Sequence, residues 1–424
     1  MKFDTEYALK RAGLNRSDTD AAGIRRESTG EGPTNWVYIA PDGIPVTDEV
    51  TLQRCASLAV PPAWTDVWYC IDPRGHLQAT GSDAKGRRQY RYHADWIAIK
   101  AAMKYDSLTV FATKLHLLRS RVRTDMGELG TSMPRSTRAW EDLALQIDRS
   151  VACATIVRLM DDFHIRVGSD EYARKNDSYG LTTMRSGHVT MKDDESSEGD
   201  LDIVFDFPGK SGKRWCIKIE DDQLSTLIEA SRYVGGLNEN SDVFRYHEPG
   251  SKRNFDIKAE HINRYIHDAT STPFTAKDFR TWAATWKTAD RLAQVLKHAV
   301  EDDSRSLARW LKRLHGAHLE VDAASALKRL VKKGPIEVGS VTARKRILLA
   351  VIDSVATDLG NTRSVCRGSY IHPTIQKDWL ENRFNERWKA TEGARFRGLR
   401  QPEARTLRYL QQAENLSLDE DQAR

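Results

Sequence analysis

The stretch Asn361-Thr-Arg-Ser-Val-Cys-Arg-Gly-Ser-Tyr370-Ile-His-Pro373 follows an apolar pattern of helical period over residues 342–359. It carries a single tyrosine with two arginines and a histidine around it. A lone tyrosine indicates nothing by itself. A tyrosine hydroxyl among cationic side chains is a candidate nucleophile for a phosphodiester, provided that other parts of the chain supply further cations. We therefore searched the upstream sequence for cationic segments.

The length and composition indicate a globular protein with two domains, because 424 residues exceed one ordinary small domain. The chain is 40% hydrophobic and 29% charged, with no run of 18 apolar residues, so no membrane span is expected. The first residues lack an apolar signal core, which predicts a cytoplasmic protein.

The net charge and the cysteine spacing narrow the class of protein and its compartment further. The formal net charge is +5, which is weak support for nucleic-acid binding unless the cations cluster. Five cysteines are scattered without a CxxC pair, and this favours a reducing compartment without structural zinc.

Residues 36–92 read as a small domain rich in β-structure. Strands are predicted over residues 36–39, 67–71 and 77–80, and Asp48 is predicted to cap a helix that ends at residue 58. After residue 92 the apolar spacing changes to that of helices. The predicted helices cover residues 96–105, 139–165, 223–234, 259–269, 274–300 and 342–359.

Two strand pairs are predicted within the helical part. One pairs residues 179–184 with 188–191, and the other pairs residues 201–207 with 214–219 around the tip Pro208-Gly-Lys-Ser-Gly-Lys213. The charged region 301–340 contains two further helical patterns, over residues 304–314 and 323–333.

The first cationic segment is residues 80–93, where basic and aromatic residues alternate at strand spacing. Tyr90 and Tyr92 should therefore face the same side. Such a strand suits a nucleic-acid surface, but its composition fits a solvated, charged edge strand equally well. The candidate DNA contacts are Lys85, Arg87, Gln89, Tyr90 and Tyr92, with Arg88 and Arg91 as further phosphate contacts.

Three more segments carry isolated cations. Arg166 follows an apolar helix, Lys210 lies on the Gly-rich hairpin tip, and Lys277 and Arg280 lie in the first turns of a predicted helix after Thr275. The start of a helix with cations is a natural anion site, so Lys277 is a further candidate DNA contact. Each segment taken alone also fits an ordinary structural role: a salt bridge, a turn lysine and a capped helix with surface charges.

In combination and in order, these segments resemble the type IB DNA topoisomerases, in particular the small bacterial and poxvirus-like form. The resemblance runs from about residue 23 to about residue 373. The motifs that carry it are Pro61-Pro-Ala-Trp-Thr-Asp-Val-Trp68, Gln78-Ala-Thr-Gly81, Gly86-Arg-Arg-Gln-Tyr-Arg-Tyr92, Phe274-Thr-Ala-Lys-Asp-Phe-Arg-Thr-Trp282 and Leu359-Gly-Asn-Thr362 through Tyr370.

The resemblance implies an active site residue by residue. Tyr370 matches the nucleophile, Arg166 and Arg280 the two arginines, and Lys210 the hairpin lysine that acts as general acid. The fifth position, which is histidine in many members, is Asn361 here. An asparagine can donate a hydrogen bond to a phosphate oxygen but cannot carry a proton in transfer.

The resemblance also implies an α+β fold that closes on DNA as a clamp. A β-rich N-terminal DNA-binding domain would cover residues 1–97, and a mainly helical catalytic domain with β-hairpins would cover residues 98–424. Residues 96–105 would form the hinge, residues 301–340 an insertion and residues 374–424 a C-terminal extension.

The implied reaction relaxes supercoiled DNA through a 3′-phosphotyrosyl intermediate, without ATP, cofactor or an obligatory metal. The expected partner is double-stranded DNA, bound by a monomer associated with the nucleoid in the cytoplasm. A tyrosine site-specific recombinase and a non-catalytic DNA clamp remain as alternatives. A metal-dependent nuclease is disfavoured, because no acidic cluster accompanies the motifs.

Overall fold

The computed structural model describes residues 5–30, 35–193, 201–248, 250–251, 253–301, 310, 323–331 and 338–422. The chain forms two compact units, Met1–Ser107 and Leu108–Arg424. Helix α3 (Ala94–Met126) runs through the boundary between them. It also runs through residue 97, so the domain boundary expected there, and the hinge at residues 96–105, stay predictions.

The N-terminal unit is built on a five-stranded antiparallel sheet in the order β2-β1-β3-β4-β5. Helix α2 (Glu49–Ser57) begins after Asp48, whose carboxylate accepts the Thr51 N–H at 2.8 Å, as the sequence predicts. Its Cys55 packs into a core with Ile24, Val67 and Tyr69. The strands are β1 (Ile24–Ser28), β2 (Trp36–Ile39), β3 (Thr65–Tyr69), β4 (Leu77–Ser82) and β5 (Arg88–Tyr92).

A second small core joins the first helix to the start of α3. Ala8 and Leu9 of α1 (Thr5–Ala12) pack with Trp96 and Met103, which lie in the part of α3 that belongs to this unit. The N-terminal unit thus has its own apolar interior, and the β-rich character predicted for residues 36–92 is confirmed.

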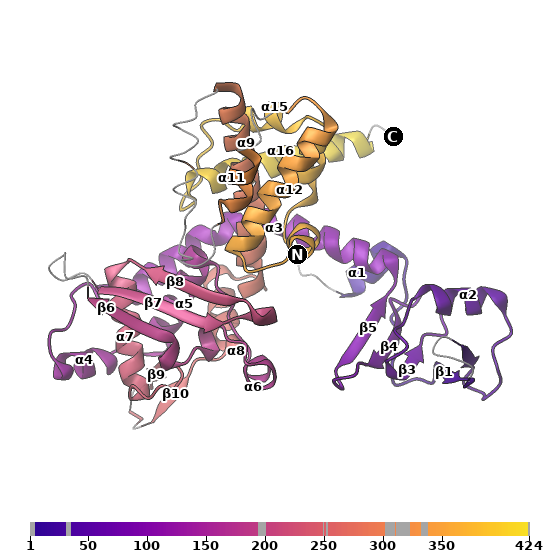
Figure 1. The fold of residues 1–424 in the computed structure, drawn as a ribbon, viewed down its shortest axis with the longest axis horizontal. Coiled ribbons are helices and arrows are strands. Elements are labelled where there is room, and N and C mark those ends of the chain that lie inside the picture. The colour runs from indigo at the N-terminus through magenta and orange to yellow at the C-terminus, as the bar shows by residue number, and fades with distance from the viewer. Residues whose placement is uncertain are drawn as a thin grey trace. The chain divides into compact units, whose positions relative to one another are not determined.

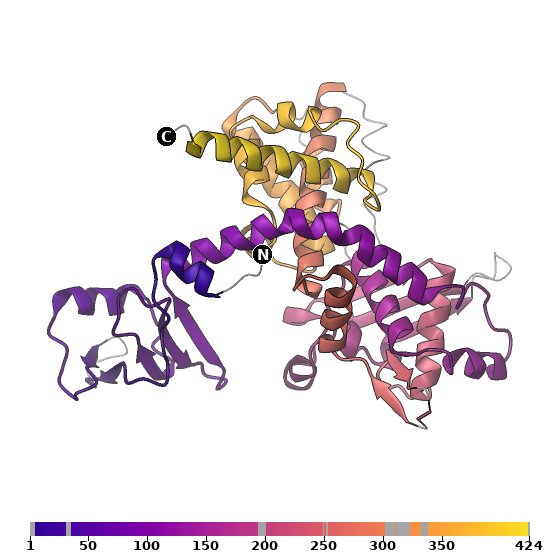
Figure 2. The same ribbon diagram turned by 180° about the vertical axis from the view of Figure 1, so that it is seen from behind.

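The larger unit combines a three-stranded antiparallel sheet with helices (Figures 1 and 2). The predicted pairing of residues 201–207 with 214–219 is confirmed by β7 (Leu201–Pro208) and β8 (Arg214–Ile219), with Phe207 opposite Trp215. The third strand, β6 (Val189–Asp193), pairs with β7. The hairpin tip between β7 and β8 contains the short 3₁₀ turn Lys210–Gly212.

The predicted hairpin of residues 179–184 with 188–191 is wrong. Residues 181–183 and 186–188 form two 3₁₀ turns, and the backbone N–H groups of Leu181 and Thr182 pair instead with Arg166 and Val167. The strand after them pairs with β7 because its partner lies beyond the loop, which adjacent-strand reasoning missed.

The predicted helix over residues 139–165 is wrong in its extent. It is two helices, α4 (Thr137–Ala144) and α5 (Arg149–Phe163), and Asp148 caps the second by accepting the Val151 N–H at 2.9 Å. The other predicted helices are confirmed in position, and the one predicted at residues 96–105 is longer. Of the two patterns in the charged region, residues 323–333 contain α11 (Ser325–Val331), and residues 304–314 lie outside the described residues apart from residue 310.

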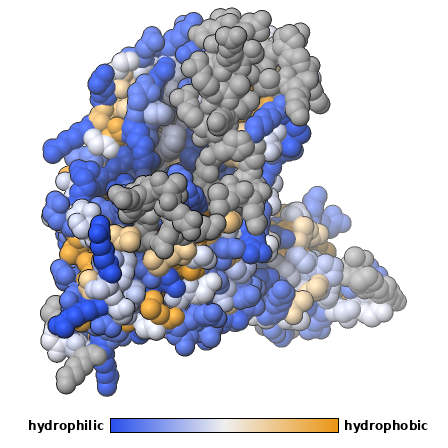
Figure 3. All heavy atoms as spheres, turned by 60° about the vertical axis from the view of Figure 1, so that its left-hand side comes forward, coloured by the Kyte–Doolittle hydropathy of each residue, from blue (hydrophilic) through white to orange (hydrophobic). Residues whose placement is uncertain are grey.

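In the larger unit, helix α9 (Ala276–Glu301) packs against both α12 (Val341–Asp358) and α16 (Gln401–Gln422) (Figures 1 and 2). The remaining elements are α6 (Asp170–Asn176), α7 (Asp222–Gly235), β9 (Arg245–His247), β10 (Asn254–Asp256), α8 (Ala259–Thr270), α13 (Arg363–Ser369), α14 (Pro373–Leu380) and α15 (Phe384–Lys389). On the face shown in Figure 3, the described residues are mostly hydrophilic, with hydrophobic ones in small separate spots.

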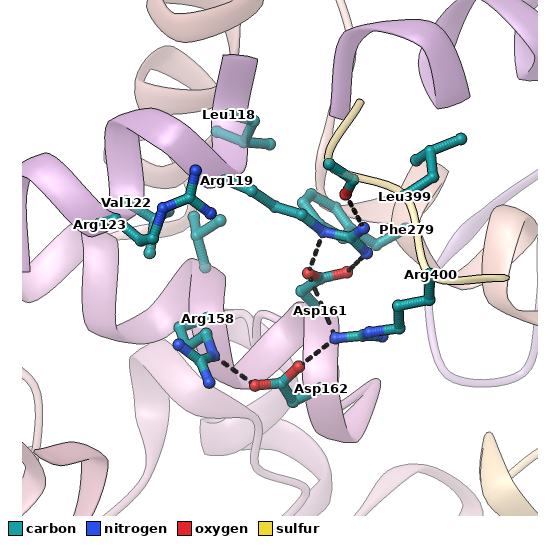
Figure 4. Close-up of a pocket in the computed structure, with 12 residues that line it drawn as sticks. Leu118, Arg119, Val122, Arg123, Arg158, Asp161, Asp162, Phe279, Leu399 and Arg400 are labelled. Atoms are coloured by element: carbon teal, nitrogen blue, oxygen red, sulfur yellow. Dashed lines mark hydrogen bonds and ion pairs between the residues drawn. The ribbon is translucent and has the colours of Figure 1, made fainter. Parts of the chain in front are cut away.

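The segment after Tyr370 is bonded to the helices next to the two candidate catalytic arginines, because α5 ends shortly before Arg166 and α9 carries Arg280. Arg119 of α3 bonds Asp161 of α5 at 2.7 Å and Glu403 of α16 at 2.8 Å, and Trp282 of α9 also donates to Glu403. Arg119 and Asp161 also line a cavity of about 300 Å³, where Asp162 lies between Arg158 and Arg400 (Figure 4). The C-terminal extension therefore braces α3, α5 and α9 as one framework.

Candidate active site

Tyr370 is the residue that ends α13 (Arg363–Ser369), and its ring is half-buried. Thr362 caps the start of this short helix by accepting the Val365 N–H, and the N–H of Tyr370 closes the end on Cys366 at 3.1 Å. The Tyr370 carbonyl accepts the Thr285 hydroxyl of α9 at 3.2 Å. The candidate nucleophile is thus fixed at its main chain, close to the helix that carries Arg280.

Arg166 follows α5 on a short extended segment that packs against residues 180–183. The Arg166 carbonyl accepts the Leu181 N–H at 2.9 Å. A Cβ on Gly180 would lie 2.6 Å from the same carbonyl oxygen, so only glycine allows this close approach. The guanidinium donates to the side-chain oxygen of Asn361 at 2.7 Å and to the Gly360 carbonyl at 3.3 Å.

Arg280 of α9 is almost fully buried, with 5% of its surface exposed. Its guanidinium donates to the carbonyl oxygens of His164 and Leu359 and lies over the Tyr370 ring at 5.7 Å. Burial lowers the pKa of Arg280, and the charge of Arg166 lowers it further, whereas a side-chain hydrogen bond with Tyr370 opposes the shift. Burial also lowers the pKa of Arg166.

Neither of these arginines forms an ion pair with a carboxylate among the described residues; carbonyl and amide oxygens hold them instead. A buried cation without a counter-charge is costly in the empty site and is stabilised when an anion enters. The pair therefore forms a prepared site for an anionic group.

Asn361 lies between the two arginines and is 7% exposed. Its side-chain oxygen accepts from Arg166 at 2.7 Å and from Arg280 at 3.5 Å. These contacts orient the amide, and its Nδ2 group is buried with no hydrogen-bond partner among the residues that the structure describes. A buried donor of this kind calls for a ligand acceptor, and a phosphate oxygen would satisfy it.

The β7–β8 hairpin brings two lysines to this site. Lys210 lies on the tip, with its Nζ over the Tyr172 ring at 5.5 Å. Lys213, which sequence reasoning did not single out, donates from Nζ to the carbonyl oxygen of Asn361 at 2.6 Å. Its position in the same Gly-rich tip, three residues after Lys210, was the signal that could have found it.

One cavity of about 260 Å³ brings the separate segments together. Arg166, Lys210, Arg280 and Tyr370 all line it, and Lys277 lies at the same cavity on the exposed first turn of α9. Four of the five expected catalytic residues and one expected DNA contact therefore converge, and Asn361 contacts both arginines beside them.

A buried ion cluster supports the segment that carries Asn361. Asp358, at the end of α12, accepts from Lys287 and from Arg291 of α9, each at 2.6 Å. Burial alone raises the pKa of Asp358, but the charges of Arg291 and Lys287 outweigh it and hold that pKa well below the usual range. Because burial lowers the pKa of Lys287, we regard Arg291 as the firmer counter-charge.

The expected DNA contacts of the N-terminal unit lie on and before β5. Tyr90 and Tyr92 are 47% and 40% exposed and stack with 6.1 Å between ring centres, so they face the same side as predicted. Lys85 is exposed. Arg87 and Gln89 are both held by Asp83, with bonds of 2.8 and 2.9 Å. Arg88 bonds Thr80, and Arg91 bonds the Ala59 carbonyl.

Among the described residues, no cluster of three or more His, Cys, Asp or Glu side chains is arranged to hold a metal ion. No helix in the described part of the chain combines the length and apolar character that a membrane span needs.

Comparison with known proteins agrees with this architecture. Residues 94–389 match the family described as Eukaryotic DNA topoisomerase I, catalytic core, and residues 35–83 match the family described as Bacterial DNA topoisomerase IB, N-terminal domain. The chain is 29% identical to DNA topoisomerase 1B of Acanthamoeba polyphaga mimivirus over 312 residues, which are 68% of this chain and 82% of the viral protein. It is 25% identical to DNA topoisomerase 1 of Schizosaccharomyces pombe over 167 residues, or 38% of this chain and 18% of that protein.

The fold and the cationic site define an enzyme of phosphodiester strand transfer, and the catalytic-core match covers most of the chain. The chain belongs to the type IB DNA topoisomerases, the isomerases that change DNA topology. The family predicted from the sequence is thus confirmed, and the recombinase and the non-catalytic clamp are set aside.

Proposed function

We propose that this topoisomerase relaxes supercoiled duplex DNA with Tyr370 as the nucleophile of transient strand cleavage. The observation that carries the assignment is the convergence of Tyr370, Arg166, Arg280 and Lys210 on one cavity from four separate segments. Each side chain has a separate task in the reaction.

In the cleavage step the Tyr370 oxygen attacks a backbone phosphorus in line with the 5′-oxygen that leaves. The new bond joins the tyrosine oxygen to phosphorus and the bond from phosphorus to the 5′-oxygen breaks. The tyrosine proton passes to solvent, and Lys210 donates a proton to the 5′-oxygen. The product is a 3′-phosphotyrosyl enzyme and a free 5′-hydroxyl. After the duplex swivels, the 5′-hydroxyl returns its proton to Lys210 and attacks the phosphorus, the bond from phosphorus to the Tyr370 oxygen breaks, and that oxygen takes up a proton from solvent. The phosphotyrosyl link conserves the bond energy, so rejoining needs no ATP.

The two arginines stabilise the charge that develops on the non-bridging oxygens. Arg166 and Arg280 have no carboxylate partner in the described structure, so their N–H groups remain available for an anion. The unpartnered Nδ2 of Asn361 donates to one of the same oxygens. Such preorganised donors account for a large part of catalysis, because they need no rearrangement when charge develops.

Lys210 is the proposed general acid for the leaving 5′-oxygen. Lys210 lines the cavity from the hairpin tip, and its ammonium lies over the Tyr172 ring, which lines the same cavity. Lys277, on the exposed first turn of α9, is proposed to contact a neighbouring phosphate. Double-stranded DNA is the expected partner, bound as a clamp by a monomer, in the cytoplasm with the nucleoid.

A plasmid assay tests the proposal directly. Negatively supercoiled plasmid is incubated with the protein in EDTA without ATP, and relaxed topoisomers and a denaturant-resistant protein–DNA adduct are expected. Tyr370→Phe should abolish both, because the phenyl ring lacks the attacking oxygen. A Tyr370→Phe protein that relaxes plasmid at the wild-type rate would disprove the assignment. The double-stranded partner is checked by competition with single-stranded DNA.

A further inference from the structure

The hairpin that carries Lys210 is joined to the Asn361 segment by two contacts. The Trp215 ring lies against Gly360, where an added Cβ would come within 2.3 Å of the ring. The ammonium of Lys213 donates to the Asn361 carbonyl at 2.6 Å. The hairpin tip is closed at its base by the Gly209 N–H, which donates to the Lys213 carbonyl at 2.7 Å. Lys213 therefore lies at the base of the loop that carries Lys210.

Lys213 differs from Lys210 in its surroundings. Lys210 lines the cavity, whereas Lys213 is half-buried and bound to the main chain of Asn361. Burial lowers the pKa of Lys213, and the charge of Arg166 lowers it further. Cys366 also interacts with Lys213, and burial raises the pKa of its thiol to about 12, so this thiol is neutral. The ammonium is thus a third cation beside the two arginines.

A bond from an ammonium to a main-chain carbonyl is charge-assisted and stronger than a neutral hydrogen bond. Here it holds the residue whose side-chain amide is oriented by Arg166 and whose Nδ2 awaits an acceptor. If the Asn361 main chain shifts, the amide loses its direction and the hairpin loses its anchor. A single contact thus controls two groups of the proposed reaction.

We propose that Lys213 is a positioning residue of the active site, which anchors the β7–β8 hairpin to the Asn361 main chain and so directs the Asn361 amide toward the scissile phosphate. This inference rests on the proposed function and deepens it, since it adds a residue that acts through another. Lys213 does not take part in proton transfer; Lys210 retains that role.

The test measures the relaxation of supercoiled plasmid and the yield of trapped adduct with enzyme in excess over DNA. Lys213→Met removes the donor and the charge, Lys213→Gln keeps a donor without charge, and Lys213→Arg keeps both. We expect Lys213→Met to slow cleavage about tenfold to a hundredfold, the range for loss of a hydrogen bond that involves a charged group. Lys213→Arg should retain most of the rate, with Lys213→Gln between the two.

Lys218→Met is the matched control, since Lys218 lies on β8, the strand that follows Lys213, but bonds Asp202 and Glu220 at 2.6 and 2.9 Å. It should relax plasmid at the wild-type rate. Thermal unfolding of each variant is recorded, and the assay is run below every midpoint. If Lys213→Met unfolds at the assay temperature, Lys213→Gln takes its place in all comparisons.

A double-mutant cycle with Asn361→Ala separates positioning from general structural support. If Lys213 acts through the Asn361 amide, Lys213→Met should cost at least about fivefold less in the Asn361→Ala background than in the wild type. Equal losses in both backgrounds would overturn the inference, as would a Lys213→Met rate within twofold of wild type. An inactive wild-type protein would instead disprove the proposed function, so the two failures are distinguishable.

Discussion

The cations of the catalytic cavity and those of the N-terminal sheet are held in opposite ways. Arg280 is buried and bonded to carbonyl oxygens, without a carboxylate among its described partners. Arg87 is half-exposed and pairs with Asp83 at 2.7 Å. The first arrangement leaves a positive charge uncompensated, and the second neutralises it. A cationic residue in a sequence motif is therefore not by itself evidence for a role in the reaction; burial and pairing must be compared as well.

The difference follows from burial. An uncompensated charge in the low-dielectric interior interacts strongly with an entering phosphate, whereas an exposed, paired charge is screened by water and salt. We expect large effects from substitutions in the cavity and small, salt-dependent effects from those on β5.

Replacement of Arg280 should give the largest loss. Arg280→Ala removes a preorganised donor from the charge that develops at phosphorus, and cleavage should slow by about 10³–10⁵-fold, by analogy with arginines in phosphoryl transfer. Arg280→Lys restores the charge but not the paired N–H groups, and should recover only part of the rate. Adduct formation measured over time with enzyme in excess checks both.

The control is the same pair of substitutions at Arg87, whose partner Asp83 already compensates the charge. Arg87→Ala should change the cleavage rate little at saturating enzyme. Comparable losses at Arg280 and Arg87 would remove the contrast between buried and exposed cations.

Substitutions in the ion cluster of Asp358, Lys287 and Arg291 should change the free energy of unfolding more than the cleavage rate. Asp358→Asn leaves Arg291 buried without its counter-charge, and the free energy of unfolding should fall by about 3–5 kcal/mol. Asp353→Asn, on the same helix, breaks an exposed pair with Arg363 and should cost about 0–1 kcal/mol. Denaturant unfolding at pH 7 compares the two variants.

The sign of the pH dependence for Asp358 follows from its lowered pKa. The folded protein favours the carboxylate, so the stabilisation is fully present above the unfolded pKa of about 4 and is lost as pH falls through the lower folded pKa. The difference between wild type and Asp358→Asn should therefore shrink in acid. A constant difference down to pH 2 would contradict a paired, ionised Asp358.

The sequence predicted which residues form the site better than it predicted the residues that hold them in place. Arg166, Lys210, Arg280 and Tyr370 were assigned by motif, and they share one cavity. The support of Arg166 was missed, because residues 180–183 meet its segment through backbone hydrogen bonds of 3₁₀ turns rather than through strand alternation. Contacts with main-chain carbonyls, such as that of Lys213 with Asn361, leave no trace in side-chain patterns.

The sequence predicted those helices and hairpins whose formation depends on residues close together in the chain. Asp48 capped α2 as expected, and the hairpin of β7 with β8 followed from alternation around a Gly-rich tip. The break between α4 and α5 was missed, since apolar spacing continues across it while Asp148 starts a new helix. The C-terminal brace through Arg119 and Glu403 joins residues 284 positions apart, beyond the range of any local pattern.

On the N-terminal sheet, exposed lysine and paired arginine should differ in their effect on DNA affinity. Lys85→Ala removes a solvated charge and should reduce the slope of log affinity against log salt by about 0.9, as expected for one phosphate contact on duplex DNA. Arg87→Ala should reduce it less, because Asp83 already compensates that guanidinium. Equilibrium binding to duplex DNA across a salt series, with Tyr370→Phe to prevent cleavage, gives both slopes. Equal slopes for the two variants would mean that DNA displaces Asp83 from Arg87.

The smallest effect concerns Asp83 itself, whose ionisation keeps Arg87 and Gln89 in place. The side-chain hydrogen bond from Arg87, and then the Arg87 and Lys85 backbone N–H groups, lower the pKa of Asp83 to about 2. Because the folded pKa lies below the unfolded value of about 4, its contribution to stability is present above pH 4 and is lost as pH falls through about 2. NMR titration of the Gln89 side-chain amide should therefore show a midpoint near 2. A midpoint near 4 would mean that Asp83 does not hold this surface, and Arg87 would then be as free for phosphate as Lys85.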